Sequence, residues 1–213
     1  MGMFFKPAEL QPREVKPFDA FPVGLPAGGV SGIVFADQLS EEIFIHHIIA
    51  STLSNSSVYH IGPGSLSIRV LEKLTESASN LYAGNTYTAE ELMSALRLVE
   101  EDSLVVVRRF PLISNLSAGT VIETKRTADE KGLTLVLCHP ALELNELDLP
   151  GEFKRLFLLP EIFDLLAVLR TNSYRGHYRM NVTVLRTPAE YVASIGDHSI
   201  PIDSLVKPFL YRG

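Results

Sequence analysis

The sequence has little cysteine. Cys138 is the single cysteine among 213 residues. One thiol can form neither an internal disulfide nor a thiolate metal cluster, which excludes a disulfide-stabilised scaffold and a cysteine-bound metal site. Free thiols persist in reducing compartments. We therefore expect a cytoplasmic protein that contains no metal.

Positive charge and long apolar runs are also scarce. The chain has 19 Lys and Arg residues against 25 Asp and Glu, a formal net charge of −6. A strongly basic footprint, the usual mark of nucleic-acid binders, is therefore missing, and any DNA binding must depend on a local patch. No apolar run approaches the roughly 18 residues of a membrane-spanning helix. The start, Met1–Lys6, has no apolar core of the kind found in signal peptides, so we expect no membrane contact.

What the chain does have is apolar residues, which make up 46% of it. That share can bury enough surface to offset the ordering entropy of a folded domain. Five prolines fall within residues 1–29 and favour extended backbone there. We predict an N-terminal arm over residues 1–29 and one core domain over residues 30–213. Four phenylalanines could fix the arm to the body or to a partner subunit: Phe4, Phe5, Phe18 and Phe21.

Strand and helix patterns alternate after the arm. Ser40 is the expected N-cap of the first helix, Thr88-Ala-Glu-Glu91 forms a capping box, and Gly132 should end a later helix. These patterns predict an α/β fold with a mixed, mainly parallel sheet flanked by helices and a C-terminal antiparallel hairpin. The predicted strands are 30–36, 57–61, 104–107, 133–138, 163–170 and 178–186, with a polar turn over 171–177, and the predicted helices are 41–53, 66–77, 88–100 and 120–131.

The stretch Gly24-Leu-Pro-Ala-Gly-Gly-Val-Ser-Gly-Ile-Val34 resembles the approach to the nucleotide loop in RecA, RadA and RadB proteins. The later elements follow an order similar to that family. The resemblance covers most of residues 20–190 and implies a RecA-like P-loop NTPase core. The matching parts are a strand at 58–61, a strand and helix at 80–96, a Walker B-like strand at 104–108, a sensor-like strand at 133–139 and a hairpin at 162–188.

The nucleotide loop itself is degenerate in this comparison. Residues 35–42 take the eight places of the G-x-x-x-x-G-K-[ST] motif. Phe35 and Ser40 stand at its glycine positions, Glu41 replaces the lysine, and Glu42 replaces the Mg²⁺-binding hydroxyl residue. Glycines allow backbone N–H groups to surround a phosphate, and the lysine neutralises it, whereas two carboxylates repel it. The resemblance therefore implies a pseudo-ATPase that binds no nucleotide cofactor.

The Walker B position is altered as well. The family needs an acidic residue after the apolar strand to hold the metal, but Arg108 and Arg109 stand there. They follow the carboxyl end of a strand, where α/β proteins bind ligands. We expect them to pair with Glu41 or Glu42 and to fill the nucleotide site. The alternative is a pair of solvated arginines, which would contribute little to stability.

A second candidate site is the turn His60-Ile-Gly-Pro-Gly-Ser65. It lacks the acid that activates water in the family. Gly62, Gly64 and Ser65 lie between a strand and a helix, and helix N-termini attract anions. A lone G-x-G is a weak signal, so a tight turn without a ligand is the alternative.

The predicted hairpin carries basic residues interleaved with an aromatic one, a composition that suits single-stranded nucleic acid. The resemblance implies that this region faces DNA or a neighbouring subunit, and a solvated basic turn is the alternative. The loop after strand 133–138 is acidic instead, so we expect weak DNA binding at most. The candidate contact residues are Arg170, Tyr174, Arg175, His177, Arg179 and Arg186, and the acidic ones are Glu143, Glu146, Asp148 and Glu152.

The resemblance implies an accessory or regulatory partner of a recombinase or related ATPase in DNA recombination and repair. Such a protein would act in a homo- or hetero-oligomer. Two alternatives remain open at this point. One is a KaiC-like signalling scaffold without DNA binding. The other is a binding protein for a small anionic ligand that uses the Gly62–Ser65 turn.

Overall fold

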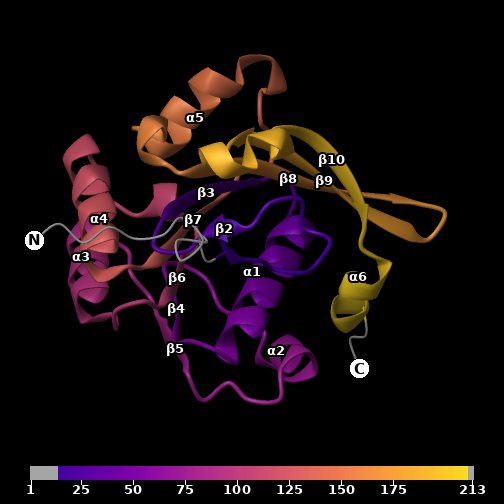
Figure 1. The fold of residues 1–213 in the computed structure, drawn as a ribbon, viewed down its shortest axis with the longest axis horizontal. Helices are drawn as coiled ribbons and strands as arrows, with labels where there is room; N and C mark the ends of the chain where they lie inside the picture. Colours follow the sequence, from indigo (N-terminus) through magenta and orange to yellow (C-terminus); the bar gives the residue numbers. More distant parts are fainter. Residues whose placement is uncertain (1–13, 211–213) are drawn as a thin grey trace, which may run out of the picture.

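The computed structural model describes residues 14–210. A mixed eight-stranded sheet has the strand order β10-β9-β8-β3-β7-β6-β4-β5. The six strands from β8 to β5 run parallel, and β9 and β10 are antiparallel additions. The predicted mixed sheet with a C-terminal antiparallel hairpin is therefore confirmed (Figure 1). The strands are β3 (Val30–Phe35), β4 (Val58–Ile61), β5 (Leu81–Gly84), β6 (Leu104–Val107), β7 (Thr134–Pro140), β8 (Leu165–Tyr174), β9 (His177–Arg186) and β10 (Gly196–Pro201).

Helices cover both faces of this sheet (Figure 1). On one face lie α1 (Gln38–Leu53), α2 (Ile68–Leu74) and α6 (Asp203–Leu210), which share one apolar core. On the other lie α3 (Ala89–Leu98), α4 (Ala118–Lys131) and α5 (Leu149–Phe157), with a second core. β3, β6 and β7 are buried almost throughout, as expected for parallel strands covered on both sides. No helix within residues 14–210 has both the length and the apolar character needed to cross a membrane.

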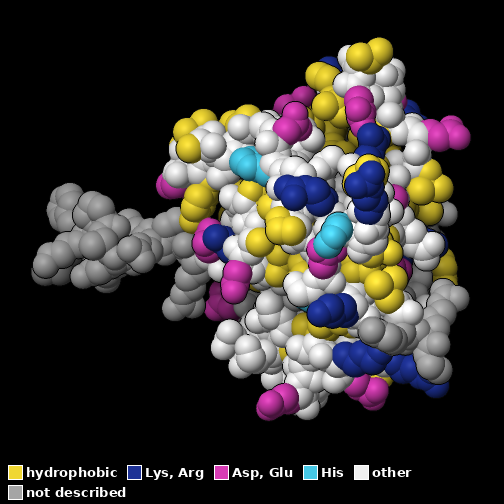
Figure 2. Space-filling model, turned by 90° about the vertical axis from the view of Figure 1, so that its right-hand side faces the viewer, with side chains coloured by type: hydrophobic (Ala, Val, Ile, Leu, Met, Phe, Trp, Pro, Cys, Tyr) yellow, Lys and Arg dark blue, Asp and Glu magenta, His cyan; other side chains and the backbone are white. Residues whose placement is uncertain are grey.

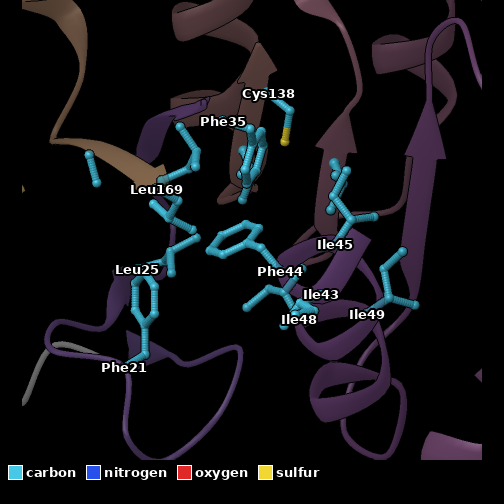
Figure 3. Packing of buried hydrophobic residues seen from close by; sticks show 14 of the residues in the cluster. Phe21, Leu25, Phe35, Ile43, Phe44, Ile45, Ile48, Ile49, Cys138 and Leu169 are labelled. Carbon is cyan, nitrogen blue, oxygen red and sulfur yellow. The ribbon is translucent and has the colours of Figure 1, made fainter. Parts of the chain in front are cut away.

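The first core joins the proline-rich segment to the body. Phe21 and Leu25 are buried beside α1, where Phe21 lies 5.7 Å from Phe44 between ring centroids (Figure 3). Phe44 in turn lies 5.5 Å from Phe35 at the end of β3. Leu25 belongs to β2 (Leu25–Pro26), which pairs with β1 (Glu14–Val15). The predicted arm is thus packed on the body from residue 14 onward, while its first 13 residues, with Phe4 and Phe5, lie outside the described range.

The helix ends predicted from the sequence agree with the structure for two helices and differ for a third. Thr88 and Glu91 form the predicted capping box, with reciprocal hydrogen bonds of 3.2 Å. Gly132 ends α4 with a positive φ of 65°. The predicted N-cap Ser40 is wrong, because α1 begins three residues earlier than expected and Asp37 is its cap. The Asp37 carboxylate accepts the Ser40 N–H at 2.8 Å.

The C-terminal region differs most from expectation. β8 and β9 continue through most of the predicted turn at 171–177, because Thr171–Tyr174 pairs with His177–Met180. Only Arg175 and Gly176 turn the chain, and both have positive φ, as a two-residue hairpin requires. Patterns in the sequence did not predict α5, β10 or α6. α5 takes up part of the segment expected to be an acidic loop.

Candidate functional site at the carboxyl edge of the sheet

The junction between β3 and α1 is short. Only Ala36 and Asp37 separate the end of the strand from the first residue of the helix. Residues 35–42, placed by the family resemblance on a phosphate loop, are therefore a strand end, a two-residue junction and the first turn of α1. A phosphate loop needs a stretch of free backbone whose N–H groups converge on the anion. This junction has no such stretch, so the expected eight-residue loop is absent from the described chain.

The N-terminus of α1 is occupied by Asp37. Its Oδ1 accepts the Ser40 N–H at 2.8 Å and the Thr171 hydroxyl at 2.6 Å. Its Oδ2 accepts the Thr171 N–H at 2.6 Å. The Ala36 N–H donates to the carbonyl of Leu169 at 2.8 Å. The positive end of the helix dipole, which attracts anions, is thus satisfied by a carboxylate that β8 holds in place.

Beside this junction lies a buried charge cluster of Arg108, Glu41 and Glu42. Arg108 Nε donates to Glu41 Oε1 at 2.7 Å, and its Nη2 donates to Glu42 Oε1 at 2.5 Å. Nη1 donates to the carbonyl of Ser65 at 2.9 Å. Arg108 is 3% exposed and Glu41 2%. The expected pairing of Arg108 with the two glutamates is confirmed.

The two carboxylates keep Arg108 charged despite its burial. Desolvation by itself would lower the pKa of the guanidinium, but the hydrogen bonds and charges of Glu41 and Glu42 outweigh it and raise that pKa. Breaking such a buried pair leaves an uncompensated charge in a low-dielectric interior, which is costly. The cluster is therefore a fixed part of the fold.

Arg109 does not join the cluster. Its backbone turns away with a positive φ of 52°. Its Nε is buried without a hydrogen-bond partner among residues 14–210. The same residues provide no ion pair between Arg109 and Glu41 or Glu42, so the pairing expected for this second arginine is wrong.

The glycine turn after β4 packs directly on Arg108. Gly62 has a φ of 111°, and a Cβ placed on it would lie 2.3 Å from the carbonyl oxygen of Arg108. This close approach requires glycine. The turn presents the Ser65 carbonyl, not an N–H group, to the guanidinium. α2 starts two residues later than predicted, at Ile68. Anion binding by Gly62, Gly64 and Ser65 stays a prediction.

His46 connects α1 to the start of α2. Its Nε2 accepts the Ser67 N–H at 3.0 Å, and its Nδ1 lies 2.8 Å from the Glu42 carbonyl oxygen. Because Nε2 accepts, the proton sits on Nδ1, which donates to that carbonyl. Burial lowers the pKa of His46, although Glu42 opposes the shift. His46 is thus a neutral capping group.

His60 and Cys138 are buried close to the cluster. His60 is 2% exposed, and its Nε2 has no hydrogen-bond partner in the described part of the chain. Burial, together with the charge of Arg108, lowers the pKa of His60 to about 4. Cys138 is buried, and burial raises the pKa of its thiol. Between residues 14 and 210, no three His, Cys, Asp or Glu side chains are placed to hold a metal ion.

The candidate hairpin residues do not form one free basic patch. Arg170 pairs with Glu146 at 2.5 Å, His177 with Asp203 at 3.2 Å, and Arg179 donates to the Ser199 carbonyl at 2.7 Å. At the tip, the Arg175 guanidinium lies 5.0 Å from the centroid of the exposed Tyr174 ring. Arg186 ends β9 nine residues beyond His177, about 30 Å away at the usual strand rise.

Sequence reasoning missed Asp37, Thr171 and His46. Asp37 carried a local signal, since Asp is as good an N-cap as Ser and stands three residues before Ser40. Thr171 lies 134 residues further along the chain, and no sequence pattern connects the two. His46 had no signal beyond its residue type, which allows a ring nitrogen to accept a backbone N–H.

Comparison with known proteins defines the fold. No protein-family model matches the chain, and no curated protein matches it. Among solved structures, the flagellar accessory protein FlaH from Methanocaldococcus jannaschii is similar, with a TM-score of 0.61 and 10% sequence identity. The similarity covers 84% of this chain and 88% of FlaH. The protein therefore has a RecA-like α/β fold.

Many proteins of this fold bind a magnesium–nucleoside triphosphate complex at the end of the first core strand. The residues at that place here do not fit such a ligand. Asp37, Glu41 and Glu42 present carboxylates, and Arg108 is already shared by the two glutamates. The geometry supports a closed structural cluster at this edge of the sheet.

Proposed function

We propose that this chain is a nucleotide-independent protein of the RecA-like fold that acts by binding another protein, as an accessory partner of a RecA-fold ATPase. The observation that carries the proposal is the Asp37 carboxylate at the start of α1, bonded to Ser40 and Thr171. It stands where an anionic ligand would need free N–H groups.

Electrostatics support the same conclusion. Glu41, Glu42 and Arg108 together carry one net negative charge when all three are ionised, and Asp37 lies close by at the same edge. Two unit charges 4 Å apart interact by about 4 kcal/mol at an effective dielectric constant of about 20. A triphosphate placed here would meet several repulsive terms of that size, and Arg108, the cation between the two glutamates, is already paired. Binding would require breaking the buried pair first.

The direct test is a thermal-unfolding titration of the full chain with ATP, ADP and GTP, each with magnesium. We expect no shift in melting temperature with any of them. A ligand present at 100 times its Kd would add about 2.7 kcal/mol to stability, which such a titration detects easily. A saturable stabilisation by a nucleotide would overturn the proposal. Inorganic phosphate in the same assay tests the alternative of an anion site at Gly62, Gly64 and Ser65.

A more specific proposal concerns binding to single-stranded DNA. A role in recombination and repair would depend on the hairpin, where Arg170 and His177 already have acidic partners. We expect weak binding to single-stranded DNA, with a salt slope equivalent to one or two phosphate contacts at roughly 0.7 per contact. Such a slope favours a protein-binding scaffold similar to KaiC. A steep slope that is lost on Arg175→Ala would favour the DNA-repair accessory role instead.

A further inference from the structure

The segment 142–149, named here the acidic loop, connects β7 to α5 and exposes apolar side chains. Its sequence is Leu-Glu-Leu-Asn-Glu-Leu-Asp-Leu. Leu142 is 77% exposed and Leu147 99%. Single exposed leucines are ordinary, but two on one short loop, interleaved with Glu143, Glu146 and Asp148, form a candidate contact surface.

Hydrogen bonds within the acidic loop and to the first turn of α5 hold its shape. Asn145 Oδ1 accepts the Leu147 N–H at 3.1 Å, and Asp148 Oδ1 accepts the Gly151 N–H at 3.2 Å. Glu146 is held by Arg170 of β8 at 2.5 Å. The leucines are therefore presented on a structured turn. Docking such a turn costs less conformational entropy than ordering a flexible segment.

A groove with complementary chemistry lies on the opposite face of the sheet, between α1, α2 and α6. Its volume is about 1000 Å³. Leu39, Val70 and Phe209 contribute apolar surface, and Lys73 adds positive charge along α2. The carboxylate of Glu42 also lines it but is paired with Arg108. Glu72 is the other acidic lining residue.

The groove opens on a face that is richer in cations than the chain as a whole. Figure 2 shows Lys and Arg side chains gathered on the side of the molecule that carries the hairpin tip and α6. The net charge of the chain is −6, so this concentration of positive charge is local. Exposed basic residues of α2, α6 and the hairpin are Arg69, Lys73, Lys207, Arg175 and Arg179.

We propose that the acidic loop of one copy docks in the α1–α2–α6 groove of a second copy. The leucines would enter the apolar part of the groove, and Glu143 and Asp148 would meet the cations beside it. The loop and the groove lie on opposite faces of the sheet (Figure 1), so one chain cannot fill its own groove. Because the two surfaces lie on opposite faces, we expect two copies to make this contact only once, head-to-tail, so that each added copy leaves one loop and one groove free.

This self-association goes beyond the proposed function and does not depend on whether a nucleotide binds. An eight-residue loop buries less than the roughly 1,200 Å² of a stable standard interface. We therefore expect weak, concentration-dependent association in the micromolar range. Salt should weaken it, because the charged pairs at its rim are exposed to solvent.

The test is sedimentation velocity of the full chain over the micromolar range, without nucleotide. Leu147→Ser removes the most exposed leucine of the loop, and Lys73→Glu reverses a charge beside the groove. Each variant should sediment as a monomer at concentrations where the wild type associates. Leu98→Ser is the matched control, because Leu98 is 84% exposed on α3, away from both surfaces. It should associate as the wild type does.

Mixing the two defective variants provides the sharpest result. Leu147→Ser keeps an intact groove and Lys73→Glu an intact loop, so an equimolar mixture should form dimers and nothing larger. Dimers would also show that both variants are folded. A monomeric mixture, a monomeric wild type, or unchanged association of Leu147→Ser would overturn the proposal. So would a monomeric wild type that binds an oligothymidine through Lys73, because the groove would then be a nucleic-acid site.

Discussion

The charge cluster around Arg108 and the acidic loop lie near the same edge of the sheet but differ in what their side chains contact. In the cluster, Arg108 donates hydrogen bonds to Glu41 and Glu42 of the same chain. In the loop, Leu147 projects into solvent. The difference indicates that the charge cluster stabilises the fold. Contacts with other molecules are then made by surfaces outside the place where this fold usually binds its ligand.

The largest expected effect comes from breaking the buried pair. Arg108→Met leaves the Glu41 carboxylate buried without its partner, and the cost should be about 3–5 kcal/mol. Arg97→Met is the matched control, because Arg97 pairs with Glu123 at the surface and should contribute less than about 1 kcal/mol. Guanidinium chloride unfolding measures both.

The double variant Glu41→Leu/Arg108→Met sharpens the result. Removing both buried charges leaves only the partly exposed Glu42 without its partner, so much of the stability lost in Arg108→Met should return. If the double variant is as unstable as the single one, packing around Arg108 matters more than its charge. Equal losses for Arg108→Met and Arg97→Met would contradict the account of the cluster.

The next effect is a loss of stability in acid. The pKa of His60 is 6.5 in the unfolded chain and about 4 in the folded one. The unfolded state therefore takes up the proton first as the pH falls. This contribution, about 3 kcal/mol, is complete above pH 6.5 and is lost between pH 6.5 and 4. His139, whose pKa burial also lowers to about 4, adds a loss of the same sign.

The unfolding free energy measured from pH 8 to pH 4 tests this. His60→Leu should flatten the decline by removing one of the titrating groups. Val58→Ala, a loss of packing on the same strand, should lower stability by a similar amount at every pH. An unchanged slope in His60→Leu would mean that folding does not lower the pKa of His60.

The smallest effect concerns Asp37. Asp37→Ala removes the α1 cap and both bonds from Thr171, and should cost about 2 kcal/mol. Ser117→Ala is the comparison, because Ser117 caps α4 without a bond to a distant strand. It should cost about 1 kcal/mol. Equal losses in denaturant unfolding would show that the connection to β8 adds nothing.

Local chemistry explains which parts were predictable. The capping box at Thr88 and the helix end at Gly132 depend only on neighbouring residues, so both could be predicted from the sequence. The Arg108–Glu41 pair was expected from the family resemblance, which placed both residues at the nucleotide site. The same resemblance assumed a phosphate loop at residues 35–42, because a one-dimensional comparison cannot show that Asp37 starts the helix early.

The C-terminal elements had weaker signals. β10 is an edge strand with Gly196 and Pro201 at its ends, and both residues are unfavourable in strands. α6 contains Pro208, which argues against a helix in any local pattern. Both are held by contacts to distant segments, such as the pairing of β10 with β9 and the packing of Val206 in the first core.

A crystal structure grown with a non-hydrolysable ATP analogue and magnesium tests the central claim most directly. We predict no nucleotide at the start of α1. Asp37 should remain bonded to Ser40 and Thr171, with Arg108 between Glu41 and Glu42. A triphosphate seated on the first turn of α1, with Asp37 or Arg108 displaced to admit it, would contradict the account.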